Sequence, residues 1–265
     1  MNADSRFLKD LKEIYEYRSI VRALVSKNLF GRYRNSVLGF GWHFVTPVVM
    51  MVVYYVVFTQ VRVSPIDNFW IYIGSGIFPF TFMMSNLTGG AGAIVSNSGM
   101  VKKMYFPREI IVISQVVSSF ITMIIGYAAV LVAVILGGYN VNWMALLFMP
   151  VVSLLMVLFT MGYTFFFSSL TVYARDVQYV LSSISMVFYF MTPMYFTADS
   201  VSGILGSVIW LNPFTYFVES YHNIVYSGEM PELNMLIAMV VISSISFVVG
   251  LAVFRRLKRG FAERL

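Results

Sequence analysis

Cysteine is absent from the 265 residues, and charged residues are scarce at 11%. The missing cysteine excludes disulfides, thiolate metal sites and cysteine nucleophiles in this chain. Soluble globular domains carry a charge on roughly a quarter of their residues, whereas 59% of this chain is hydrophobic. The composition therefore predicts an integral membrane protein and leaves no room for a large soluble domain.

Patterns for nucleotide binding and catalysis are also missing. No lysine follows a glycine, so the phosphate-binding pattern G-x-x-x-x-G-K-[ST] does not occur, and ATP and Mg²⁺ are expected on a partner chain. His43 and His222 lie far apart in the sequence and on opposite sides of the expected membrane, which favours packing or interfacial roles over a shared metal site. Asp176 and Glu219 have no partner carboxylate at a spacing for acid–base catalysis. We therefore predict that the chain is not an enzyme and binds no cofactor or metal itself.

Long apolar segments are what the sequence has instead. A transmembrane helix needs about 20 apolar residues, and six segments qualify: 37–58, 70–94, 110–136, 143–172, 177–196 and 235–254. The second is rich in glycine, which is common where membrane helices pack closely. Residues 201–226 are broken by Asn212 and Pro213 into stretches too short to span, which favours a re-entrant pair of short helices. The expected fold class is all-α integral membrane, with six transmembrane helices and a re-entrant helical hairpin between spans five and six.

Positive charge tests this topology independently. All but one of the 18 Lys and Arg residues fall on a single side of the six-span arrangement, and the exception is Arg62. Because Lys and Arg concentrate in cytoplasmic loops, both termini are expected in the cytoplasm. The expected organisation is a cytoplasmic interface segment at 1–36, a transmembrane domain at 37–254 and a cytoplasmic basic tail at 255–265.

Two cytoplasmic segments combine basic and apolar side chains. Residues 1–36 alternate apolar and basic residues at helical spacing, which predicts an amphipathic helix in the lipid headgroup region. This helix is either a plain lipid anchor or also a docking face for a cytoplasmic partner. The loop at 96–109 is either a solvated basic loop or a contact surface, since exposed Tyr105 and Phe106 beside cations favour binding.

Aromatic residues make up 17% of the chain. Most are expected to face lipid, to pack, or to lie in interfacial belts. Some could line a conduit for sugars, because the apolar face of a sugar ring stacks on an aromatic ring. The candidates are Tyr54, Tyr55 and Phe58. No Asp, Glu, Lys or Arg lies in the middle of an expected span, which argues against an ion-coupled transporter.

Four motifs occur in order along the chain: FGRYRNSVLGFGWHFVTP at 30–47, VKKMYFPREI at 101–110, YARDVQYV at 173–180 and LNPFTYFVESYHNIVYSGEMP at 211–231. Together with the six-span profile, they resemble the membrane subunits of type-2 ABC exporters for polysaccharides, teichoic acids, O-antigens and capsules. With their spacing they cover nearly the whole chain.

The resemblance implies a homodimer paired with two copies of a separate ATPase in the cytoplasmic membrane of a bacterium or archaeon. Its substrate would be a lipid-linked polysaccharide, and no nucleic acid is expected as a partner. By the resemblance, the loop at 96–109 contacts the ATPase through Lys102, Lys103, Tyr105, Phe106 and Arg108. Arg32 and Arg34 would lie at the cytoplasmic substrate entrance. The segment 200–228 would form an outer gate that includes Asn212, Pro213 and Glu219. The sequence departs from the family at His222, near which an arginine is common.

A second function class stays open at this point. A type-2 ABC exporter of drugs or small lipids would share the topology, and a scaffold or channel without an ATPase is a weaker alternative. Drug-exporting relatives usually place a large extracellular domain or a different loop signature between spans one and two, whereas 59–69 is short. This favours the polysaccharide exporter.

Overall fold

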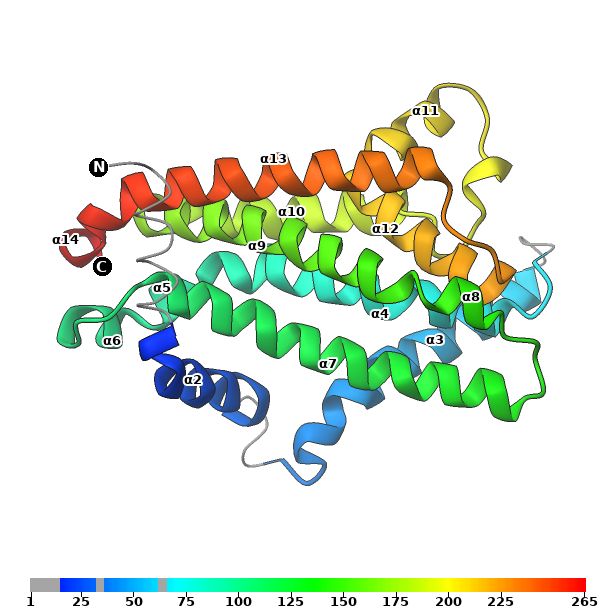
Figure 1. Ribbon diagram of the computed structural model, residues 1–265, viewed down its shortest axis with the longest axis horizontal. Coiled ribbons are helices and arrows are strands. Elements are labelled where there is room, and N and C mark those ends of the chain that lie inside the picture. Colours follow the sequence, from blue (N-terminus) through cyan, green and yellow to red (C-terminus); the bar gives the residue numbers. More distant parts are fainter. Residues whose placement is uncertain (1–14, 32–35, 62–65) are drawn as a thin grey trace.

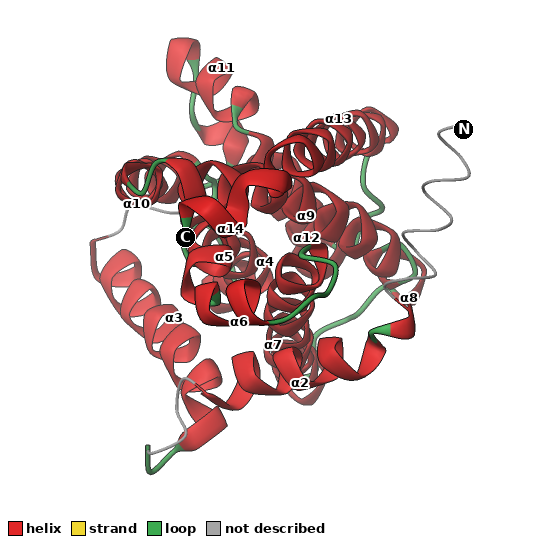
Figure 2. Ribbon diagram, turned by 90° about the vertical axis from the view of Figure 1, so that its left-hand side faces the viewer, coloured by secondary structure: helices red, strands yellow, loops and turns green. Residues whose placement is uncertain are grey.

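The computed structural model describes residues 15–31, 36–61 and 66–265, and within them all regular structure is helical (Figures 1 and 2). Arg32, Arg34 and residues 1–14 of the expected interface segment lie outside the described residues, as do the side chains of His43, Tyr54 and Phe58. The helices are α2 (Arg18–Gly31), α3 (Trp42–Val61), α4 (Phe69–Thr88), α5 (Ala93–Ser96), α6 (Ser98–Lys103), α7 (Glu109–Leu136), α8 (Trp143–Leu146), α9 (Met149–Tyr173), α10 (Asp176–Met191), α11 (Gly203–Leu211), α12 (Pro213–His222), α13 (Leu233–Leu257) and α14 (Phe261–Arg264).

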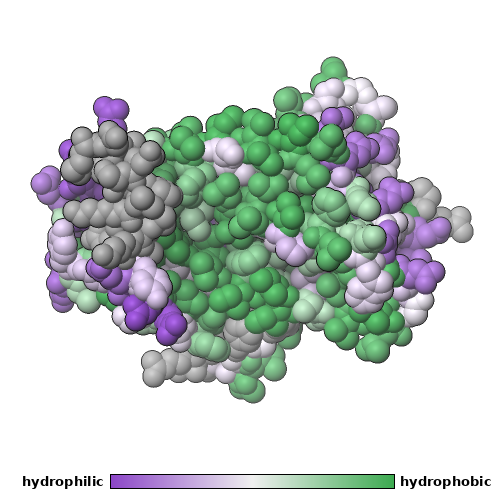
Figure 3. Space-filling model, viewed as in Figure 1, coloured by the Kyte–Doolittle hydropathy of each residue, from purple (hydrophilic) through white to green (hydrophobic). Residues whose placement is uncertain are grey.

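The long helices run side by side along the longest dimension of the molecule (Figure 1). One end of this bundle carries α2, α6 and α14, and we refer to it as the α6 end. The opposite end carries α8 and α11 and is called the α11 end. An apolar band separates the two more hydrophilic ends on the face shown in Figure 3, as expected of a protein that crosses a bilayer.

Three helical segments are long and apolar enough to cross a membrane. They cover Glu109–Leu136, Trp143–Tyr173 and Leu233–Arg264, with 28, 31 and 32 residues. These segments coincide with the expected third, fourth and sixth spans, so the all-helical, multi-pass character is confirmed. The six-span count stays a prediction.

Helix α4 lies at the centre of the bundle (Figure 2). Nearly all of its residues are buried, and it contacts α3, α7, α9, α10 and α12. Its glycines explain how so many neighbours fit, because a Cβ on Gly74 would lie 3.1 Å from Val130 and one on Gly76 would lie 2.6 Å from His222. The expected segment 70–94 is not one helix, since α4 ends at Thr88 and a 3-10 turn at Gly90–Gly92 leads into α5.

Helices α9 and α13 pack closely against each other. A Cβ on Gly162 or on Gly250 would overlap the backbone of the facing helix. Ser243 and Ser246 of α13 donate hydrogen bonds of 2.9 Å to the carbonyls of Leu155 and Phe159 on α9. Small residues that let backbones approach, reinforced by interhelical hydrogen bonds, are the usual way in which membrane helices associate.

Candidate coupling surface and outer gate

The loop expected to contact a partner is built from the short helix α6 and an extended turn. Helix α6 ends at Lys103, with Lys102 and Lys103 in its last turn, where cations interact favourably with the helix dipole. Met104 is extended, and Pro107 follows before α7 begins at Glu109. The Lys27 ammonium of α2 donates a hydrogen bond of 2.8 Å to the Asn97 side chain, which fixes this loop to the N-terminal helix.

The five expected contact residues divide into two groups. Lys102, Lys103 and Tyr105 are exposed, and Tyr105 retains 93% of its accessible surface. Phe106 is buried, contrary to the expectation that it is exposed, because it packs in an apolar cluster with residues of α7, α9 and α13. Arg108 is half-buried and turned toward the C-terminal segment. An exposed surface of two lysines and a tyrosine remains, and tyrosine is enriched in protein–protein interfaces.

One face of helix α2 packs against the bundle, and the opposite face is exposed. Leu24 and Leu29 are buried, and the helix lies against α7. A groove of about 380 Å³ separates α2 from α6. Its lining is mostly apolar: Ser19, Ile20, Ala23, Leu24, Lys27, Met100 and Met104. Residues 18–31 of the interface segment therefore form a helix that packs on the bundle beside the loop at 96–109.

The expected gate segment consists of two short helices that meet at Asn212. The Asn212 Oδ1 atom accepts a 3.0 Å hydrogen bond from the backbone N–H of Phe214, and its Nδ2 atom donates one of 2.9 Å to Thr192. Pro213 takes the first position of α12, where its missing N–H costs nothing. Asparagine and proline thus end α11 and start α12. Most of α11 is exposed, whereas α12 is mostly buried against α4, α9 and α13.

Glu219 and the segment after α10 lie together at the α11 end. The Glu219 carboxylate accepts a 3.3 Å hydrogen bond from the backbone N–H of Ala198. In the part of the chain that the structure describes, no group of three or more His, Asp or Glu side chains gathers where it could hold a metal ion.

His222, for which the sequence favours a packing or interfacial role, is buried where three segments of the chain meet. Its ring stacks on Tyr72 at 3.9 Å between centroids and 4° between planes. The Nε2 atom lies 3.0 Å from the Pro193 carbonyl, and Nδ1 lies 2.7 Å from the Ser75 hydroxyl. Because a carbonyl oxygen only accepts, Nε2 must carry a proton. The imidazole therefore ties α12 to α4 and to the segment that follows α10.

Tyr72 extends this polar cluster. Its hydroxyl donates to the carbonyl of Phe196 at 2.8 Å and lies 3.2 Å from that of Pro193. The ring of His222 occupies the space beside Gly76. No local sequence signal links these residues, because Ser75 and His222 are 147 positions apart.

Replacing His222 with alanine is expected to loosen the packing of α12 against α4. The change removes the two buried hydrogen bonds that the imidazole makes with the Pro193 carbonyl and the Ser75 hydroxyl, each worth about 0.5–1.5 kcal/mol, and empties the space that the ring fills beside Gly76. We expect a lower thermal unfolding temperature of the detergent-purified protein. The control is Tyr226→Phe, which removes one 2.9 Å hydrogen bond to the Asp67 carbonyl near the surface. Equal unfolding temperatures for the His222→Ala protein and the unmodified protein would contradict this assignment.

Comparison with known proteins places this architecture in a family. Residues 20–226 match the family model described as ABC-2 type transporter. The chain is 29% identical over 257 residues to an O-antigen export system permease protein RfbA of Myxococcus xanthus, which covers 96% of this chain and 98% of that relative. It is 26% identical over 242 residues to a protein of the same name from Klebsiella pneumoniae, which covers 91% of this chain and 93% of the relative. Since the family model matches well over half of its length, this chain belongs to the ABC-2 type transporter family.

Proposed function

We propose that this chain is the membrane subunit of an ATP-driven exporter that moves a lipid-linked polysaccharide, of the O-antigen, capsule or teichoic acid type, across the cytoplasmic membrane. The observation that carries the proposal is full-length similarity to relatives named O-antigen export system permease, at 26–29% identity over 91–96% of this chain. The family match over residues 20–226 includes the loop at 96–109 and nearly all of the gate segment, so the similarity is not confined to the apolar helices.

The proposed topology has six spans, with α3, α4 and α10 added to the three long apolar segments. Helices α3 and α4 have 20 residues each, and 20 residues rise about 30 Å, the thickness of the hydrocarbon core. Helix α10 has 16 residues and is extended by the turn that follows it. In this arrangement the α6 end, which carries most of the lysines and arginines, faces the cytoplasm. Helices α11 and α12 form the re-entrant hairpin at the outer side.

The proposed assembly is two copies of this chain and two copies of a separate ATPase. The ATPase copies would bind ATP and Mg²⁺ and dock on the exposed Lys102, Lys103 and Tyr105. Phe106 and Arg108 would support that surface from beneath. Arg32 and Arg34 would receive the anionic lipid-linked substrate at the cytoplasmic entrance, because a basic entrance attracts it.

The proposed conduit lies where two copies meet. Helix α3 supports this because it carries a row of exposed apolar residues, including Tyr55 with 42% of its surface exposed. Tyr54, Tyr55 and Phe58 would offer ring faces to the sugars. The outer gate would be formed by α11 and α12, with Asn212 and Pro213 at their joint and Glu219 holding α12 to the preceding turn.

Deletion of the gene in its own host tests the proposal. We expect the surface polysaccharide to disappear and its lipid-linked precursor to accumulate inside the cell, with both restored by the intact gene. Undiminished surface polysaccharide combined with new sensitivity to drugs would instead favour the drug or small-lipid exporter. The names of the relatives do not support that alternative.

A further inference from the structure

The C-terminal segment, predicted as a cytoplasmic basic tail, folds back onto the helical bundle. After α13 ends at Leu257, a 3-10 turn at Lys258–Gly260 leads into α14. This last helix contacts α6 and α9. The C-terminus therefore lies at the α6 end, against the proposed coupling loop (Figure 2).

Phe261 anchors this segment. Its side chain is fully buried, with its ring 5.5 Å from that of Phe254 and 6.4 Å from that of Tyr173. The guanidinium of Arg108 lies over the same ring at 5.8 Å. Tyr173, the last residue of α9, donates a 2.9 Å hydrogen bond to the Leu257 carbonyl. One aromatic side chain thus joins the ends of α9 and α13 to the beginning of α7.

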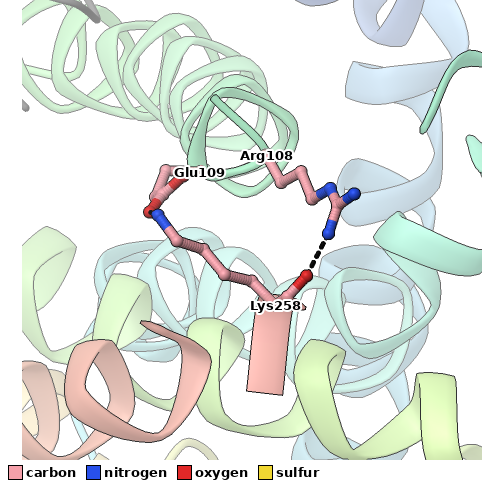
Figure 4. Close-up of polar contacts among 3 residues, drawn as sticks. All are labelled: Arg108, Glu109 and Lys258. Carbon is pink, nitrogen blue, oxygen red and sulfur yellow. Dashed lines mark hydrogen bonds and ion pairs between the residues drawn. The ribbon is translucent and has the colours of Figure 1, made fainter. Parts of the chain in front are cut away.

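An ion pair and a hydrogen bond also join the start of α7 to Lys258, directly after α13 (Figure 4). The Lys258 ammonium pairs with the Glu109 carboxylate, and the Arg108 guanidinium donates to the Lys258 carbonyl. The Glu109 side chain is only 8% exposed, and that of Lys258 is 34% exposed. Breaking a buried ion pair by removing one partner is costly, because the remaining charge stays in the protein uncompensated. Glu109 also lies in the first turn of α7, where the helix dipole favours a negative charge.

We propose that Glu109, Lys258 and Phe261 form a C-terminal clasp that positions the coupling surface and passes its displacement to α13; this inference rests on the proposed function. The covalent connection from α6 to the membrane helices supports it. Along the chain, α6 is joined to α4 through α5 and the 3-10 turn at Gly90–Gly92 on one side, and to α7 through residues 104–108 on the other, so neither covalent path reaches α13. The clasp is a direct contact from the start of α7 to α13, which packs along α9.

The clasp is tested in proteoliposomes that hold this chain, its ATPase and the lipid-linked polysaccharide of the host. The variants are Lys258→Met, Glu109→Gln and the two together. Because the displacement of the coupling surface would no longer be passed to α13, we expect Lys258→Met to lower the amount of polysaccharide exported per ATP hydrolysed while ATP hydrolysis continues. The double variant should recover part of that loss, because no buried carboxylate is left unpaired. Arg259→Met and Glu263→Gln are matched controls, since both residues are exposed on the same segment.

An export-to-hydrolysis ratio that is unchanged in Lys258→Met would overturn the clasp while leaving the proposed function intact. If the unmodified complex exported no polysaccharide, the proposed function would fail instead. Should Lys258→Met not fold, cross-linking provides a second measurement, because the chain has no cysteine of its own. With Glu109→Cys and Lys258→Cys joined by a short bifunctional reagent, export per ATP is expected to persist. Loss of export on cross-linking would contradict a clasp that moves as one unit.

Discussion

Replacing Gly250 with leucine should destabilise the protein more than any other single change considered. A Cβ at this position overlaps the Gly162 carbonyl, so α9 and α13 would have to separate along their closest contact. Overpacking costs about 1–3 kcal/mol, and separation also weakens the two serine hydrogen bonds between the helices, each worth roughly 0.6 kcal/mol in a membrane. We expect a loss of about 3 kcal/mol or more, seen as a lower unfolding temperature and less inserted protein.

The matched control for this prediction is Val249→Leu. Val249 precedes Gly250 on α13 but is 48% exposed on the apolar surface, so added volume there meets no neighbouring helix. Its unfolding temperature should match that of the unmodified protein. If Gly250→Leu were as stable as Val249→Leu, the close crossing of α9 and α13 would be wrong.

Reversing two charges on α6 should weaken binding of the proposed ATPase more than any other change described above. The double variant Lys102→Glu with Lys103→Glu places two negative charges on the exposed surface where the ATPase is proposed to dock. Juxtaposed like charges cost several kcal/mol, so the Kd for the ATPase should rise by about a hundredfold or more. Binding of the purified ATPase to this chain in nanodiscs measures the change. Binding to the unmodified chain should also weaken at high salt, because exposed charges are screened.

The control for this experiment is a double charge reversal at the opposite end of the bundle. Glu229 and Glu232 are exposed at the α11 end, and Glu229→Lys with Glu232→Lys changes the charge by the same amount with opposite sign. ATPase binding should be unaffected by this pair. Full ATPase binding by the α6 double variant would show that the partner docks elsewhere.

Hydropathy was sufficient to predict the long apolar helices, because their length and composition are local properties. The expected spans 110–136 and 235–254 agree closely with α7 and α13. The expected fifth span, 177–196, extends beyond α10, which ends at Met191. Thr192 precedes Pro193, and a residue before proline avoids the helical conformation. The end of α10 at Met191 could therefore have been predicted from the sequence.

Long-range contacts could not be predicted in the same way. The His222 ring is buried in the space beside Gly76 and hydrogen-bonds the Ser75 hydroxyl, and Ser75 lies 147 positions away in the sequence. Phe106 and Phe261 appear in sequence as apolar residues among cations, yet both are buried in one cluster with Phe254. The neighbours of a residue in the sequence indicate how often such a side chain is exposed, but its burial depends on which distant residues pack against it.

Reconstitution tests the central claim most directly. Proteoliposomes would contain lipid-linked polysaccharide with this chain alone, with the ATPase alone, or with both, and protected polymer would be measured after ATP is added. We predict ATP-dependent translocation only when both proteins are present, and no ATP hydrolysis by this chain alone. Translocation by this chain without the ATPase, or no translocation of the polymer by the complete complex, would contradict the proposed exporter.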